Sequence, residues 1–149
     1  MVEEAIAMCP EIPGGYIMLG WICHRDFKLG NTKSPQETLE KGMELAQKGL
    51  AMDDSTANAA VAHSILCLLY LDKGEFDEAI TEGERSVALD PSRSSILQNY
   101  ADSLSSAGRP EEAIPLFQKT IRLDPFAPSS FYRSFGVALM PGFLVSRQI

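Results

Sequence analysis

His63 and Cys67 are the residues of this chain best suited to metal chemistry, because they lie four positions apart. In a helix this spacing puts both side chains on one face, where a nitrogen and a sulfur could ligate zinc. A structural zinc site takes four ligands, and no second pair of histidines or cysteines accompanies this one. Because cysteine is often a small buried hydrophobe, we expect both residues to pack in the interior, with no metal bound.

A nucleophilic mechanism has as little support. Cys23 and His24 are adjacent, so in a helix their side chains would point about 100° apart, and no orienting group or oxyanion site can be nominated. The paired carboxylates belong to expected turns or first helical turns, where the helix dipole favours them: Glu3 and Glu4, Asp53 and Asp54, and Glu111 and Glu112. The glycines are scattered, unlike those of a phosphate-binding loop. The sequence predicts no catalytic residue, no cofactor and no enzyme.

Composition disfavours several classes of partner. The 149 residues include 20 acidic and 13 basic ones, which gives a formal net charge of −7. Such a surface repels phosphate backbones, so we expect no nucleic-acid binding. No apolar run approaches the ~18 residues that cross a bilayer, and the start lacks the basic segment of a signal peptide. Three separated cysteines, Cys9, Cys23 and Cys67, indicate free thiols in a reducing compartment. We expect a cytoplasmic location without membrane attachment.

An internal repeat organises the chain. When the segment Leu66–Pro91 is shifted by 34 residues, it falls on Tyr100–Pro125. The shift superimposes two glycines, two Glu-Ala-Ile triplets and two Asp-Pro pairs: Gly74 on Gly108, Glu78–Ile80 on Glu112–Ile114, and Asp90-Pro91 on Asp124-Pro125. A period of this length is typical of tandem helical hairpins that stack on one another.

Each copy is predicted to be a pair of helices. The apolar residues between Phe76 and Leu89 recur at helical spacing. Gly74 and Gly108 fall where the chain must reverse, a place that favours a residue tolerant of positive φ. The Asp-Pro pairs should end the second helices, since proline disfavours helical geometry in the residue before it. Pro115 lies inside an expected helix, where it should kink the axis.

The two copies resemble the tetratricopeptide repeat family in their alternation of large and small residues. The first copy carries Leu66, Cys67, Tyr70, Gly74, Ala79 and Pro91, and the second carries Tyr100, Ala101, Leu104, Gly108, Ala113, Phe117 and Pro125. The resemblance implies an all-α fold, a right-handed α–α solenoid of helical hairpins with about three repeats and a half-repeat at each end. It also implies a protein or peptide as the partner.

A looser, expanded repeat precedes these two copies. It contains a long turn, after which Ser34, Pro35 and Glu37 are predicted to start a helix with a capping box. The helix-favouring run Ala57–Ala62 predicts an extra helical turn before His63. We expect a single domain over residues 1–149, divided into a half-repeat helix at 1–10, a degenerate expanded repeat at 14–54, repeats at 55–91 and 92–125, a terminal helix at 128–140 and a tail at 141–149.

The candidate partner-binding groove is the inner face of the solenoid, which the first helix of every hairpin lines. The repeat alignment places these residues on it: Ile17, Trp21, His24 and Arg25 from the expanded repeat, Val61, Ser64, Leu68 and Leu71 from the next, Ser95, Gln98, Asn99, Asp102 and Ser105 from the third, and Ser129, Tyr132 and Arg133 from the terminal helix.

The kind of ligand follows from these positions. Some members of the family clamp the terminal carboxylate of a chaperone peptide with Lys, Arg and Asn residues on this face. Here only Asn99 and Arg133 match that pattern, which disfavours a carboxylate clamp. A helix or an extended peptide with apolar anchors suits Trp21, Leu68 and Leu71 better.

Two other roles stay open. The half-repeats at both ends favour a regulatory or sensory segment of a larger signalling protein. The segment Ser34–Ser55 is also similar to repeat regions appended to bacterial nucleotide cyclases, which implies the same role. Self-association is the second role, because solenoid ends need a polar cap. Apolar side chains instead crowd the C-terminal end, which predicts a homo-oligomer formed through terminal helices: Phe131, Tyr132, Phe135 and Phe143.

Overall fold

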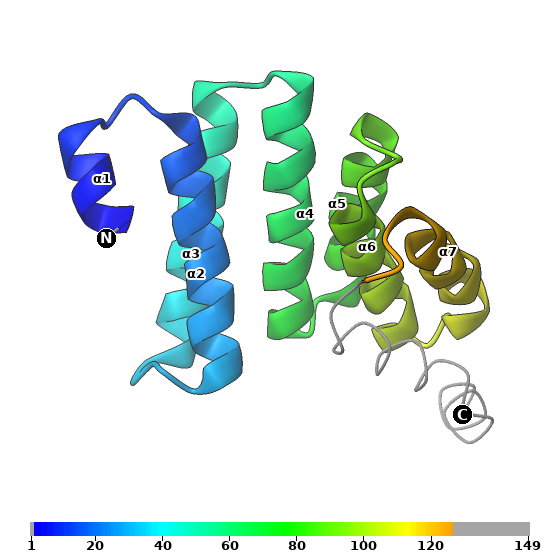
Figure 1. The fold of residues 1–149 in the computed structure, drawn as a ribbon. Coiled ribbons are helices and arrows are strands. Elements are labelled where there is room, and N and C mark those ends of the chain that lie inside the picture. The colour runs from blue at the N-terminus through cyan, green and yellow to red at the C-terminus, as the bar shows by residue number, and fades with distance from the viewer. Residues whose placement is uncertain (1, 127–149) are drawn as a thin grey trace.

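The computed structural model describes residues 2–126, and these form seven α-helices and no β-strand (Figure 1). The helices are α1 (Val2–Met8), α2 (Pro13–Leu29), α3 (Pro35–Met52), α4 (Thr56–Lys73), α5 (Phe76–Leu89), α6 (Ser94–Ser106) and α7 (Pro110–Leu123). None of the helices in this part of the chain combines the length and the apolar character needed to span a lipid bilayer.

Six of these helices are arranged as three hairpins, α2–α3, α4–α5 and α6–α7, whose two members pack along one another. The hairpins follow one another across the molecule in chain order (Figure 1). The first helices form a continuous layer, because α2 contacts α4 and α4 contacts α6. The second helices join each hairpin to the next through α3–α4 and α5–α6 contacts. This arrangement confirms the all-α solenoid of helical hairpins that the repeat predicted.

The turns inside the hairpins form as their sequence requires. Gly74 and Gly108 adopt φ values of 80° and 83°, a left-handed conformation that costs glycine no steric strain. The second helices end before the Asp-Pro pairs, at Leu89 and Leu123. Helix α7 continues through Pro115, so the repeat pattern predicted this element better than the local helix breaker did.

The start of α3 differs from the expected capping box. Ser34 is the N-cap residue and Pro35 opens the helix, but the Ser34 side chain makes no capping hydrogen bond. Instead, the Ser34 N–H donates to the Thr32 hydroxyl at 3.2 Å, and that hydroxyl lies 2.6 Å from the hydroxyl of Thr38. Thr32 therefore ties the turn to the first turn of α3, a connection that the pattern of a capping box does not contain.

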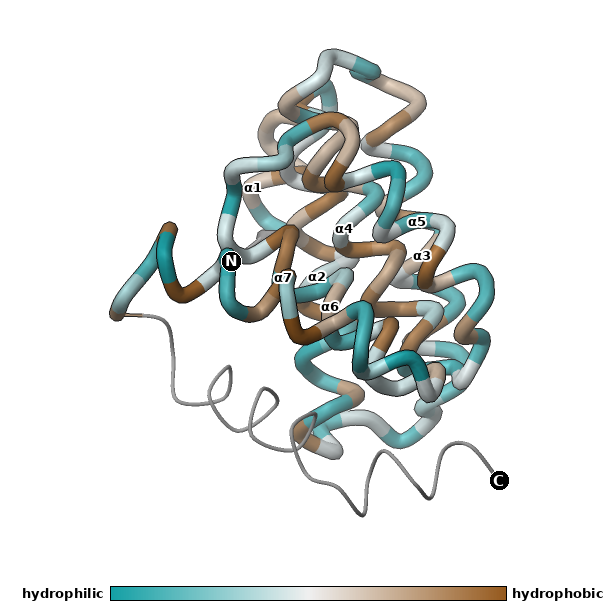
Figure 2. Tube along the Cα trace, turned by 90° about the vertical axis from the view of Figure 1, so that its right-hand side faces the viewer, coloured by the Kyte–Doolittle hydropathy of each residue, from teal (hydrophilic) through white to brown (hydrophobic). Residues whose placement is uncertain are grey.

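The hydrophobic core consists of two clusters of buried side chains. One cluster lies between α2, α3 and α4 and contains Ile17, Leu39, Met43, Ala46, Ala62, Ile65, Leu66 and Leu69. The other lies between α5, α6 and α7 and contains Ile80, Ala101, Leu104, Ala113 and Phe117. Apolar and polar residues alternate along each helix (Figure 2), as expected for helices that bury one face.

Glycines allow the closest helix–helix approaches. A Cβ atom added to Gly20 would lie 3.0 Å from the carbonyl oxygen of Gly42, so the backbones of α2 and α3 nearly touch. A Cβ atom on Gly49 would lie 2.6 Å from Cγ1 of Ile17 and 2.8 Å from the carbonyl oxygen of Pro13.

Helix α4 is longer than α6, with 18 residues against 13, which agrees with the helix-favouring run at its start. The expected terminal helix at 128–140, the tail at 141–149 and the aromatic residues invoked for self-association lie outside the described residues.

Candidate functional site

A hollow of about 260 Å³ opens on the layer of first helices, where α2, α4 and α6 meet. Each of the three helices contributes to its lining: Met18 and Trp21 from α2, Val61, Ser64 and Ile65 from α4, and Arg93, Ser95, Ile96 and Asn99 from the start of α6. The hollow therefore depends on the stacking of three successive hairpins, and a single hairpin could not form it.

The walls of the hollow are apolar and partly open to solvent. Trp21 is 38% exposed and Met18 is 48% exposed. Ile65 and Ile96 are buried beside them, and Val61 is half-buried. Exposed large apolar side chains that gather around a concavity mark interaction sites more often than scattered ones do.

A few polar groups border the apolar walls. The Asn99 side-chain amide donates to the Ser64 hydroxyl at 2.8 Å, which links α6 to α4. Nε of Arg93 donates to Oδ2 of Asp90 at 2.9 Å. Desolvation acts to raise the pKa of the Asp90 carboxyl. The hydrogen bonds from Arg93 and Ser92 outweigh this effect and hold the pKa below its usual value. The Arg25 guanidinium lies over the Trp21 ring, 5.4 Å from its centroid, a cation–π geometry.

The structure brings together only part of the predicted groove. Trp21, Ser64 and Asn99 line the hollow, together with Val61 and Ser95. Leu68, Leu71, Gln98 and Asp102 are half-buried on the same helices, outside the lining of the hollow. Ser105 is buried. Ser129, Tyr132 and Arg133 lie outside the described residues.

Three residues that were predicted for the exposed inner face are buried: Ile17, Ser64 and Ser105. Ile17 was expected on the exposed inner face, but it is only 3% exposed and belongs to the core cluster of α2, α3 and α4. Its side chain fills the space that Gly49 leaves on α3. The adjacent residue Met18, and Trp21 about one turn further along α2, supply the exposed side chains in its place. A rotation of about 100° between adjacent helical residues is enough to exchange buried and exposed positions.

The groove predicted from the sequence did not include four of the residues that line the hollow: Met18, Ile65, Arg93 and Ile96. Met18 precedes Trp21 by three residues, so helical spacing alone could have placed it on the same face. Arg93 is the N-cap residue of α6 and falls just outside the helix that the repeat alignment considered. Ile65 and Ile96 form part of the buried floor, which a search for exposed positions excludes.

His24 belongs to a polar cluster that joins α2 to α4 around the buried Asp72 side chain. Its Nδ1 lies 2.5 Å from Oδ2 of Asp72 on α4, and Nζ of Lys28 lies 3.7 Å from Oδ1 of the same carboxylate. The Asp72 side chain is 0% exposed, and its Oδ1 accepts no hydrogen bond from the described residues. The cluster joins α2 to α4 and so holds two sides of the hollow together.

His63 has a comparable partner. Its Nδ1 lies 2.5 Å from Oε2 of Glu82 on α5, and Nη1 of Arg85 donates to the other oxygen of that carboxylate at 2.7 Å. Cys67 points elsewhere, because its Sγ donates to the carbonyl oxygen of Asn99 at 3.6 Å. Residues 2–126 contain no group of three or more potential metal ligands. Cys67 is buried and His63 is half-buried, each in contact with a neighbouring helix.

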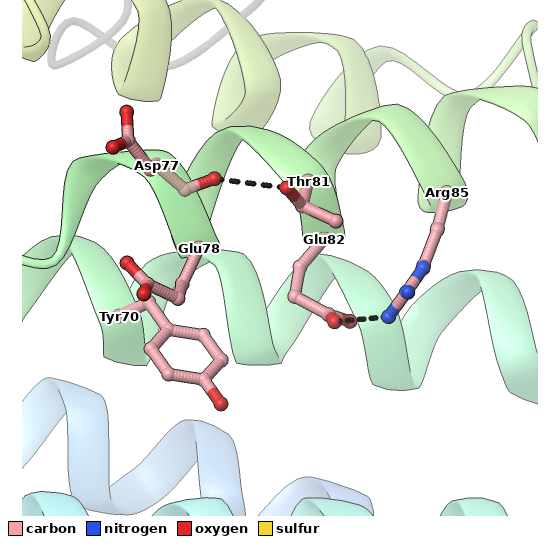
Figure 3. Close-up of a pocket in the computed structure, with 6 residues that line it drawn as sticks. All are labelled: Tyr70, Asp77, Glu78, Thr81, Glu82 and Arg85. Carbon is pink, nitrogen blue, oxygen red and sulfur yellow. Dashed lines mark hydrogen bonds and ion pairs between the residues drawn. The ribbon is translucent and has the colours of Figure 1, made fainter.

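A second, acidic hollow of about 290 Å³ lies against α4 and α5 and is lined by Tyr70, Asp77, Glu78, Thr81, Glu82 and Arg85 (Figure 3). Desolvation, together with the charge of Glu82, raises the pKa of Tyr70. The polar groups here bond to one another: Glu82 accepts from Arg85, and the Thr81 hydroxyl donates to the Asp77 carbonyl oxygen at 3.0 Å (Figure 3). We interpret this hollow as a solvated acidic surface.

The cysteines should differ sharply in reactivity. Burial raises the pKa of the Cys67 thiol to about 12, against a small opposing effect of Ser103. Since the thiolate is the nucleophile, Cys67 should resist iodoacetamide at pH 8 in the folded protein, while exposed Cys9 reacts readily. Peptide mass spectrometry after timed alkylation measures both rates, and unfolding in urea should equalise them. Equal rates in the folded protein would contradict the burial of Cys67.

Comparison with known proteins identifies one hairpin by its sequence. Residues 94–126, which span α6 and α7, match the model of the tetratricopeptide repeat family. No curated protein sequence is significantly similar to the chain.

Solved structures extend the likeness to the whole fold. A thermophilic tetratricopeptide repeat protein of Thermus thermophilus is 21% identical, with a TM-score of 0.76 over 93% of this chain and 69% of that one. YrrB, described as having an unusual peptide-binding site, is 21% identical, with a TM-score of 0.65 over 93% of this chain and 64% of that one. The second such domain of human RPAP3, solved with an HSP70 peptide, is 17% identical, with a TM-score of 0.64 over 86% of this chain and 98% of that one.

At these identities the solved structures establish the fold. The chain has the fold of tetratricopeptide repeat proteins and carries the repeat of that family in its α6–α7 hairpin. The resemblance seen in the two copies of the sequence repeat is thereby confirmed.

Proposed function

We propose that the chain is a non-catalytic protein–protein interaction module that binds a peptide or a segment of a partner protein in the hollow between α2, α4 and α6. The observation that carries the proposal is the half-exposed Trp21 at this hollow, with Met18 beside it. Tryptophan is enriched among the residues that dominate binding energy in interfaces. The hollow offers such a side chain at a place where three helices provide further contacts.

The size of the hollow supports a peptide over a small molecule. Sites for small molecules usually have volumes of about 300–1,000 Å³ and enclose most of the ligand. The volume here is about 260 Å³, which suits one large side chain projecting from a longer segment. Two structurally similar proteins support the same reading, since YrrB has a peptide-binding site and the RPAP3 domain was solved with a peptide.

Other properties of the chain support a non-catalytic role, a partner other than nucleic acid or membrane, and a cytoplasmic location. Both histidines are held by carboxylates from neighbouring helices, so a structural role accounts for them and no catalytic one is invoked. The net charge of −7 opposes binding to nucleic acids and to anionic lipid surfaces. We place the protein in the cytoplasm, in keeping with its three free cysteines.

Replacing Trp21 with alanine is the direct test. Peptides selected from a displayed random library on the wild-type chain should bind the Trp21→Ala variant about 30-fold more weakly, which corresponds to a hot-spot contribution of ~2 kcal/mol. Surface plasmon resonance measures the affinity, and circular dichroism checks that the helices persist. Leu123→Ala is the matched control, because Leu123 is 44% exposed at the end of α7, a helix that contributes no residue to the lining of the hollow. Selected peptides that bind the wild type and the Trp21→Ala variant equally would refute the proposed site.

A further inference from the structure

Charge is distributed unevenly between the two layers of helices. The second helices α3, α5 and α7 contain nine acidic and five basic residues. The first helices α2, α4 and α6 contain three of each sign. Among the six hairpin helices, the excess acidity is therefore carried by the second helices, and the layer that bears the hollow is electrically balanced.

Two guanidinium groups flank the apolar walls of the hollow. On the α2 side, exposed Arg25 lies over the Trp21 ring at 5.4 Å. On the α6 side, Arg93 is part of the lining, and its side chain is 46% exposed. The hydrogen bond of Arg93 to Asp90 uses Nε, and a guanidinium has five N–H donors with which to bind carboxylates.

We propose that the segment bound in this hollow is acidic: it inserts one bulky apolar side chain between Trp21 and Ile96 and places carboxylates beside it, against Arg25 and Arg93. This inference rests on the proposed function and names the class of its partner. Charge complementarity carries it, because the apolar hollow lies between two cations in a molecule whose net charge is −7. Complementary charges of this kind set specificity and association rate more than total affinity.

Arg25 and Arg93 are exposed, so their contribution to binding should depend on neighbouring charges and on salt. An acidic segment would meet Asp90 as a competing carboxylate, because Asp90 pairs with Arg93 at 2.9 Å. Removing the charge of Asp90 should thus strengthen the binding of such a segment, while removing Arg25 or Arg93 should weaken it. Salt should weaken binding as well, since exposed charges are screened over roughly 10 Å at 0.1 M ionic strength.

The first experiment uses short random peptides displayed with their carboxyl end fused to the carrier, so that no terminal carboxylate is offered. Selection on the wild-type chain should enrich peptides that contain a bulky apolar residue with Asp or Glu close to it. Enriched peptides that are neutral or basic, but that still depend on Trp21, would overturn this inference and leave the proposed function standing. Failure to enrich any peptide that depends on Trp21 would overturn both.

The second experiment measures the affinity of one enriched acidic peptide for variants of the whole chain by the change in Trp21 emission. Trp21 is the single tryptophan of the sequence and lines the hollow, so its fluorescence reports occupancy. The double variant Arg25→Gln/Arg93→Gln should bind about fivefold more weakly than wild type, and Asp90→Asn about twofold more tightly. Arg122→Gln, which removes an exposed charge on α7, should bind as wild type does. Equal affinity of the double variant and the Arg122→Gln control would overturn the inference.

Discussion

Replacing His24 with leucine is expected to destabilise the fold by about 3 kcal/mol, because the buried Asp72 carboxyl loses its hydrogen bond to the His24 ring. The substitution leaves the Asp72 carboxylate at 0% exposure with Lys28 at 3.7 Å as its remaining charged contact. A carboxylate without adequate partners in the interior is far more costly than an apolar residue of the same size. Urea unfolding followed by circular dichroism measures the change in the free energy of unfolding.

The double variant His24→Leu/Asp72→Leu separates this explanation from simple loss of packing. Replacing both partners by apolar residues removes the buried charge, so the double variant should be more stable than His24→Leu alone. A variant on the exposed surface, Lys28→Gln, should change stability little, because the Lys28 side chain is 60% exposed and exposed pairs contribute about 0–1 kcal/mol. Additive losses in the double variant would show that the His24–Asp72 contact has no special importance.

Replacing Gly49 with alanine is expected to cost about 2–3 kcal/mol, even though alanine is the better helix former. The new Cβ would lie 2.6 Å from Cγ1 of Ile17 and 2.8 Å from the carbonyl oxygen of Pro13. The side chain of Ile17 could adjust, but the carbonyl belongs to the backbone at the start of α2. The whole of α2 would have to move away from α3, which would loosen the core cluster that contains Ile17. The unfolding midpoint in urea measures the loss.

Gly14→Ala is the matched control for this prediction. Gly14 also lies in a helix, but a Cβ added there meets nothing within 4 Å. The substitution should therefore stabilise the protein by about 0.5–1 kcal/mol through helix propensity alone. If Gly49→Ala stabilised the protein as much as Gly14→Ala, the close approach of α2 and α3 would be refuted.

Most of the fold could be predicted because the repeat supplies evidence that no single helix contains. Superposition of two copies located the glycine turns at Gly74 and Gly108 and the helix ends at the Asp-Pro pairs, and all of these occur in the structure. Each of these features depends on the backbone preferences of one or two residues. The repeat also predicted that α7 runs through Pro115, where local propensity alone favours a break.

The candidate site was harder to predict, because it depends on the rotation of each helix about its own axis. Ile17 and Met18 are neighbours, yet one is buried and the other is exposed. The alignment of the loose first repeat was too weak to fix that rotation. Contacts between residues far apart in the sequence could not be predicted either. His24 and Asp72 are separated by 48 positions, and no spacing in the sequence indicates that they meet.

The two core clusters have a consequence for how the chain could gain or lose repeats during evolution. The α4–α5 hairpin is one copy of the sequence repeat, yet α4 contributes to the first cluster and Ile80 of α5 to the second. A deletion of α6 and α7 would therefore strip the cover from Ile80 and leave α5 packed mainly against α4. An inserted hairpin could serve as a replacement only if its first helix offered α5 the same small and large pair that Ala101 and Leu104 provide. The hydrophobic clusters thus cross the boundaries between the duplicated hairpins, and this obliges neighbouring copies to coevolve.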